Sequence, residues 1–238
     1  MTLRLYKNAA DYRGGAVYLN REGSVTGCNF NNCSNTGGYG GTLYLNDGGN
    51  VTGCNFTDSF CNSMGGAIFI KGGNISNCIF TNCSANTEGG AITIWGKSGT
   101  VSDCAFINCY IDRNWYSDPS DGGAIYFSAE GTVSNCNFTN CYCLNRLFLN
   151  EGNDGGAISI NGDKGTVSNC NFMNCHADSY GGAVYFSAEG TVSNCNFTNC
   201  AANGNTTYHY GGAICIRGDK GTVNDWYIFL VRYFYSIS

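Results

Sequence analysis

The sequence has few charged residues, almost no proline and no long hydrophobic run. Charged residues make up 12% of 238, against about a quarter in an ordinary domain, and there is one proline. The net charge of −5 comes without a basic stripe or a polybasic segment, which argues against nucleic acid and a membrane surface as partners. No segment approaches the roughly 18 apolar residues of a spanning helix, and the opening MTLRLYKNAADYRGG lacks the apolar core of a secretory signal.

In their place the sequence has 35 glycines and a repeat. The phrase GTVSNCNFTNC occurs at 131–141 and again at 190–200. A Gly-Gly doublet recurs every 24 to 33 residues, which is typical of a solenoid. The doublets begin at Gly14, Gly40, Gly65, Gly89, Gly122, Gly155, Gly181 and Gly211.

Each repeat unit predicts three short strands. After the doublet, apolar residues alternate with variable ones, as at Ile125 and Phe127, which indicates a strand with one buried face. A second strand contains Val133, and a third buries Cys136 and Phe138. The residue before each cysteine of the phrase is Gly, Asn or Asp, the types that tolerate a left-handed bend.

Three strands and three bends in about 25 residues describe one coil of a parallel β-helix. We therefore expect an all-β solenoid of about eight coils of three short strands, about 38 Å long at the strand spacing. It would be a single domain over 1–238 with an atypical C-terminal coil at 222–238. Both ends read as if cut within a coil, so we expect a fragment of a longer repeat protein, with end-to-end association through uncapped coil edges.

Three long insertions, 110–121, 142–154 and 201–210, fall at the same corner of the coil. Insertions on one face of a solenoid are the usual place for a binding surface, although their aromatic residues could instead cover the adjacent strand. The predicted binding residues are Trp115, Tyr116, Asp118, Asp121, Phe148, Tyr208, His209 and Tyr210.

The units of the form GGAIYF followed by FTN resemble repeats of chlamydial polymorphic outer-membrane proteins. They are more similar still to adhesin-like surface proteins of methanogenic archaea, which carry right-handed parallel β-helix repeats. The resemblance covers residues 5–225 and implies a right-handed helix and an extracellular or cell-surface location as part of a longer exported protein. One departure is that Cys141 and its equivalents stand where the family has asparagine.

The 16 cysteines admit three interpretations: a packing ladder, disulfides, or a metal site. Buried thiols pack as small apolar groups, and stacked columns neither converge on one point nor orient their Cβ atoms for bridging. We therefore predict cysteine and asparagine ladders, with no metal and no cofactor. A column of Glu130, Asp163, Glu189 and Asp219, with lysines beside it, would hold Ca²⁺ weakly or form a solvated edge.

The leading functional prediction is a non-catalytic, adhesin-like segment that acts as a rigid spacer or binds a glycan or surface protein through the loops of one corner. The alternative is a polysaccharide lyase or hydrolase, whose carboxylates would have to cluster. We expect the carboxylates at this corner to lie in loops without a repeated geometry; they are Asp112, Asp118, Asp121, Glu151 and Asp154. A third hypothesis, ice or mineral binding, rests on outward Ser and Thr columns such as Ser134 and Ser168.

Overall fold

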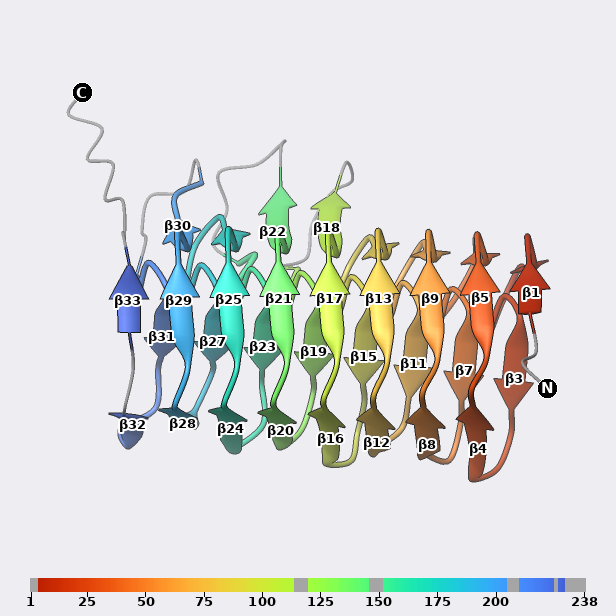
Figure 1. The fold of residues 1–238 in the computed structure, drawn as a ribbon, viewed down its shortest axis with the longest axis horizontal. Helices are drawn as coiled ribbons and strands as arrows, with labels where there is room; N and C mark the ends of the chain where they lie inside the picture. The colour runs from red at the N-terminus through yellow and green to blue at the C-terminus, as the bar shows by residue number, and fades with distance from the viewer. Residues whose placement is uncertain (1–3, 114–119, 146–151, 205–209, 225–226, 230–238) are drawn as a thin grey trace.

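The computed structural model describes residues 4–113, 120–145, 152–204, 210–224 and 227–229. Strands joined by turns make up this part of the chain, and all the strand pairs are parallel. Four sheets run side by side along a rod, with β1 and β33 at opposite ends (Figure 1). The predicted all-β, parallel β-helix of about eight coils is confirmed.

We name the sheets by their place in a coil, starting from the doublet. The Gly-Gly sheet contains β3 (Val17–Leu19), β7 (Leu43–Leu45), β11 (Ile68–Ile70), β15 (Ile92–Ile94), β19 (Ile125–Phe127), β23 (Ile158–Ile160), β27 (Val184–Phe186) and β31 (Ile214–Ile216). The valine sheet contains β4 (Gly23–Thr26), β8 (Gly49–Thr52), β12 (Gly73–Ser76), β16 (Gly99–Ser102), β20 (Gly131–Ser134), β24 (Lys164–Ser168), β28 (Glu189–Ser193) and β32 (Gly221–Asn224).

The phenylalanine sheet contains β1 (Arg4–Tyr6), β5 (Asn29–Asn31), β9 (Asn55–Thr57), β13 (Ile79–Thr81), β17 (Ala105–Ile107), β21 (Asn137–Thr139), β25 (Asn171–Met173), β29 (Asn196–Thr198) and β33 (Tyr227–Phe229). The corner sheet contains β2 (Ala9–Ala10), β6 (Ser34–Asn35), β10 (Phe60–Cys61), β14 (Ser84–Ala85), β18 (Tyr110–Arg113), β22 (Tyr142–Asn145), β26 (His176–Ala177) and β30 (Ala201–Ala202). Each coil thus has four short strands rather than the three predicted. The corner strand begins directly after the second cysteine of the phrase.

The predicted bends lie where left-handed backbone is needed. Asn135 and Asn140 both have a φ of 54°, and each precedes a buried cysteine. Their side chains also form ladders: the Nδ2 atom of Asn140 donates to Oδ1 of Asn108 at 3.0 Å, and Asn174 donates to Asn140 at 3.1 Å. The asparagine ladder is therefore confirmed, and it satisfies side-chain amides that would otherwise depend on water.

A column of phenylalanines fills the core between the two cysteine columns. Successive rings stack with centroids 4.8 to 5.0 Å apart, close to the strand spacing. The stacked residues are Phe30, Phe56, Phe80, Phe106, Phe138, Phe172 and Phe197. Identical residues meet because the parallel register pairs each coil with its equivalent in the next, as Phe106 with Phe138.

The first cysteine column has a hydrogen-bonding role as well as a packing role. The backbone N–H of Cys104 donates to Sγ of Cys136 at 3.4 Å, and Cys136 N–H donates to Cys170 at the same distance. The Sγ of Cys136 in turn donates to the carbonyl of Ser134 at 3.1 Å. Sulfur therefore accepts the amide hydrogen at a bend, where a left-handed residue interrupts the regular carbonyl ladder.

All 16 cysteines are free, and 15 of them are buried. We expect a thiol reagent such as dithiobis(nitrobenzoate) to modify about one group in the folded protein, since Cys215 is the one partly exposed thiol, and all 16 in guanidinium chloride. Burial also raises the pKa of the Cys61 thiol to about 12, which further suppresses its thiolate. Fewer than 16 reactive groups after denaturation without reductant would indicate disulfides and contradict the free-thiol ladder.

Candidate functional site

Each of the three long insertions begins with a strand of the corner sheet, and these strands, β18, β22 and β30, lie along one edge of the rod (Figure 1). Among the predicted binding residues, Asp121 and Tyr210 are described, and both directly precede a Gly-Gly doublet. The other six lie outside the described residues, so their role stays a prediction; they are Trp115, Tyr116, Asp118, Phe148, Tyr208 and His209.

The position before the doublet forms a column over the outer face of the Gly-Gly sheet. Isolated bridges pair Glu88 with Asp121 and Asp121 with Asp154 on successive coils. We call these three residues the acidic ladder. The expectation that the carboxylates at this corner lack a repeated geometry is therefore wrong for Asp121 and Asp154. Because the insertions differ in length, the residues of the acidic ladder are unevenly spaced in the sequence. Aligning the coils on their Gly-Gly doublets shows that these residues occupy equivalent positions.

Hydrogen bonds hold the acidic ladder in place. The backbone N–H of Asp154 donates to Oδ1 of Asp121 at 3.3 Å, and Nδ2 of Asn161 donates to Oδ2 of Asp121 at 3.2 Å. One coil further on, the N–H of Tyr180 donates to Oδ1 of Asp154 at 3.1 Å. Burial raises the pKa of Asp121 to about 6, although the bonds from Asn161 and Asp154 favour the charged form.

Aromatic side chains adjoin the acidic ladder. Tyr126, on β19, is buried, and its hydroxyl accepts a hydrogen bond from Nδ2 of Asn161 at 3.3 Å. Burial, together with the charges of Asp121 and Glu88, raises the pKa of Tyr126 to about 12. Trp95 follows β15 and tilts against Tyr126, with ring centroids 6.4 Å apart, while 38% of its surface is exposed.

We call Trp95, Tyr126, Asn161 and the acidic ladder the central patch. Trp95 offers an exposed aromatic surface, and Asn161 and Asp121 offer amide and carboxylate groups close by. Such a combination of a flat apolar ring and hydrogen-bonding groups suits a ligand with both C–H faces and hydroxyls, as sugars have. Sequence reasoning missed Trp95 because it follows a strand of ordinary length and lies in no insertion.

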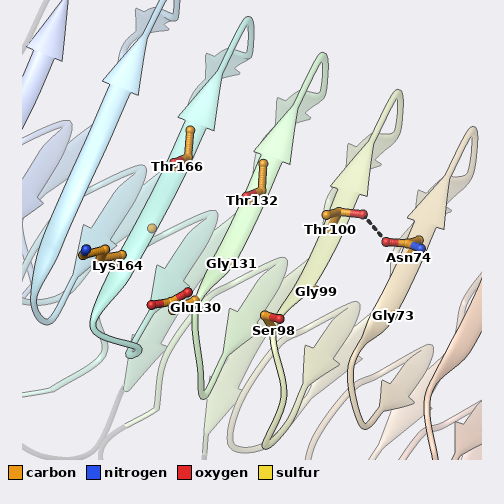
Figure 2. Close-up of a pocket in the computed structure, with 11 residues that line it drawn as sticks. Gly73, Asn74, Ser98, Gly99, Thr100, Glu130, Gly131, Thr132, Lys164 and Thr166 are labelled. Carbon is orange, nitrogen blue, oxygen red and sulfur yellow. Dashed lines mark hydrogen bonds between the residues drawn. The ribbon is translucent and has the colours of Figure 1, made fainter.

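A second surface is a polar groove on the valine sheet (Figure 2). Its volume is about 320 Å³, and its lining includes Asn74, Thr100, Thr132 and Thr166. The Oγ1 atom of Thr100 donates a hydrogen bond to Oδ1 of Asn74 at 2.6 Å, so these two lining side chains are already paired with each other.

The charged rim of this groove is not the acidic column expected from the sequence. The register pairs Lys164 with Glu189, and Nζ of Lys220 lies 3.9 Å from a carboxylate oxygen of Glu189. Glu130 lines the same groove as Lys164 (Figure 2). Acidic and basic residues therefore alternate along this edge, and the neighbouring lysines partly neutralise the carboxylates that would attract Ca²⁺. Across the described ranges, no group of three or more His, Cys, Asp or Glu side chains is arranged to hold a metal ion.

Comparison with known proteins identifies the fold family. A family model described as a right handed beta helix region matches residues 43–220. Neither the curated proteins nor the solved structures give a match to the chain. Within the part of the chain that the structure describes, no helix has the length and apolar character needed to cross a membrane.

Proposed function

The chain belongs to the family of right-handed β-helix regions, and from this premise we propose that it is an adhesin-like surface segment that binds glycans on the outer face of the Gly-Gly sheet. The location would be extracellular, within a longer exported protein. The rod would hold the binding face at a fixed distance, since hydrogen-bonded strands and stacked side chains continue from coil to coil. End-to-end association of rods stays a prediction.

The observation that carries this proposal is the central patch. An exposed tryptophan, a buried tyrosine, an amide and carboxylates gather on successive coils beside the corner that carries the insertions. Aromatic residues are depleted from most exposed surfaces but enriched where ligands bind. The predicted loop residues, from Trp115 to Tyr210, would extend this surface.

Replacing Trp95 by alanine should weaken glycan binding about 30-fold, the effect of losing one aromatic anchor of about 2 kcal/mol. Binding would be measured on a glycan array and then by calorimetry with the best oligosaccharide. Met173→Ala is the matched control, because Met173 is similarly exposed, at 45%, on the phenylalanine sheet. Equal affinities for both variants and the unmodified chain would place the binding face elsewhere.

A second candidate function is cleavage of polysaccharides. It is favoured by the pKa of Asp121, near 6, and by the adjacent carboxylates of the acidic ladder, since a proton donor and a charged partner are the two groups that glycoside hydrolysis requires. Release of new sugar ends from a polysaccharide panel, lost in Asp121→Asn and in Asp118→Asn, would support an enzyme. Binding without any product would favour the adhesin-like function.

A further inference from the structure

The outer face of the Gly-Gly sheet changes chemistry toward the N-terminal end of the rod. Arg13 occupies there the position before the doublet that the acidic ladder occupies in later coils, and it bridges to Tyr39 in the next coil. Four basic residues lie within residues 1–22, namely Arg4, Lys7, Arg13 and Arg21, against two acidic ones, Asp11 and Glu22. This coil thus carries a net charge of +2 in a chain whose net charge is −5.

Aromatic rings hold the Arg13 guanidinium in place. Its Cζ atom lies 5.0 Å from the ring centroid of Tyr12 and 4.9 Å from that of Tyr44. Tyr44 is almost fully buried, at 2% exposed, and stacks on Tyr18 with centroids 5.5 Å apart. Cation–π contacts of this kind restrain the guanidinium without neutralising its charge.

The Arg13 charge has no carboxylate partner among the described residues, whereas Lys97 pairs with Asp47 at 3.5 Å and Lys220 with Glu189 at 3.9 Å. The nearest acidic residue in the sequence, Asp11, accepts a hydrogen bond from Thr36 at 3.5 Å. In addition, Nε of Arg13 is buried without a hydrogen-bond partner. A rigidly held and uncompensated guanidinium is suited to binding an external anion.

The surroundings of Arg13 restrict what kind of anion fits. Tyr12, which contacts the cation, is 65% exposed, and Tyr18, which stacks on the second contacting ring, Tyr44, is 44% exposed. The Tyr18 hydroxyl donates to Oδ1 of Asn20 at 2.9 Å, and Nδ2 of Asn46 donates to the same oxygen at 3.3 Å. The rings suit the C–H face of a pyranose, and the amides suit its hydroxyl groups.

We propose that Tyr12, Arg13, Tyr18, Asn20, Tyr44 and Asn46 form a second glycan site that binds a carboxylate-bearing sugar. The guanidinium pairs with the sugar carboxylate while the exposed tyrosine rings pack against the pyranose. The central patch would repel the same sugar through the acidic ladder, so the two sites select glycans of different charge on one face. This site does not depend on the central patch for its chemistry.

The test uses the full chain and two probes, an oligosaccharide that ends in glucuronic acid and the same oligosaccharide with that carboxyl reduced to an alcohol. We expect Arg13→Met to weaken binding of the acidic probe about tenfold or more, since it removes a charge-assisted bond, and to leave binding of the reduced probe unchanged. Arg21→Met is the control for net charge, and thermal unfolding of each variant checks that it folds.

Trp95→Ala separates this site from the proposed function. We expect that variant to bind the acidic probe with unchanged affinity. Arg13→Lys keeps the charge but loses the planar fork, so we expect it to bind the acidic probe with intermediate affinity. The proposal is overturned if Arg13→Met binds the acidic probe normally, or if both probes bind equally to the unmodified chain. It is also overturned if Trp95→Ala abolishes binding of the acidic probe, or if an acidic peptide displaces that probe at equal concentration.

Discussion

Replacing Gly123 by alanine is expected to unfold the central coils of the rod. A Cβ atom at this position would lie 2.1 Å from the carbonyl oxygen of Gly156 and 2.5 Å from that of Tyr142. Both are backbone atoms, so neither can rotate away as a side chain would. The N–H of Gly123 also donates to the carbonyl of Gly155 at 3.0 Å, and a shift large enough to relieve the contact would break this bond.

The expected loss in the free energy of unfolding exceeds the roughly 1–3 kcal/mol of ordinary overpacking, because backbone on the next coil must move. In a solenoid each coil is stabilised by its neighbours, so a break at the middle should also divide one cooperative unfolding transition into two. Urea unfolding followed by circular dichroism measures both effects. Hydrogen exchange would locate the loss of protection on β19 and β23.

Gly27→Asn is the matched control for this prediction. Gly27 has a φ of +64°, and a Cβ atom there would meet nothing within 4 Å. Equivalent bends in other coils already hold asparagine, as at Asn135. We expect this variant to unfold at the same urea concentration as the unmodified chain. Wild-type stability of Gly123→Ala would contradict the close-packed role of the second glycine of the doublet.

The features of the fold that could be predicted from the sequence are those in which one residue type repeats at one position. The Asn, Asp and Gly residues before each cysteine predicted the left-handed bends, and alternation after the doublet predicted the Gly-Gly sheet. Phe138 and its equivalents predicted the central column because the same aromatic residue returns in seven coils. Repetition is informative here because parallel register places equivalent residues in contact.

The corner sheet could not be predicted in this way. Most of its strands are two residues long, too short for alternation to show, and their residues range from Ala9–Ala10 to Phe60–Cys61 and His176–Ala177.

The acidic ladder could not be predicted for a related reason. The position before the doublet holds arginine, tyrosine, methionine and carboxylates in different coils, so no residue type marks it as a column. Counting backward from each doublet would have revealed it.

The two proposed glycan surfaces follow from this same variation. Inward columns are restricted to residues that pack on their own copies, whereas the column before the doublet lies over the outer face and varies freely. In this column Arg13 gives a cationic end and Asp121 gives an acidic centre. Function in this fold is therefore expected at outward columns where the repeated residue type is lost.

Asp121→Asn is expected to remove a pH-dependent loss of stability. The ordinary pKa of an aspartate is 3.8, and burial raises that of Asp121 to about 6. Between these values the folded chain holds a proton that the unfolded chain has released, so stability falls as the pH rises through this window. The shift of about two units corresponds to about 3 kcal/mol.

We therefore expect Asp121→Asn and the unmodified chain to unfold at similar urea concentrations at pH 4. At pH 8 the variant should be more stable by up to about 3 kcal/mol, less what it loses with the hydrogen bond from Asn161. Asp47→Asn is the control, because Asp47 is exposed and pairs with Lys97, so its loss should change stability by less than about 1 kcal/mol. A stability difference that is the same at both pH values would show that Asp121 titrates normally. It would also remove the main argument for Asp121 as a proton donor, since a carboxyl of ordinary pKa is fully charged near neutral pH.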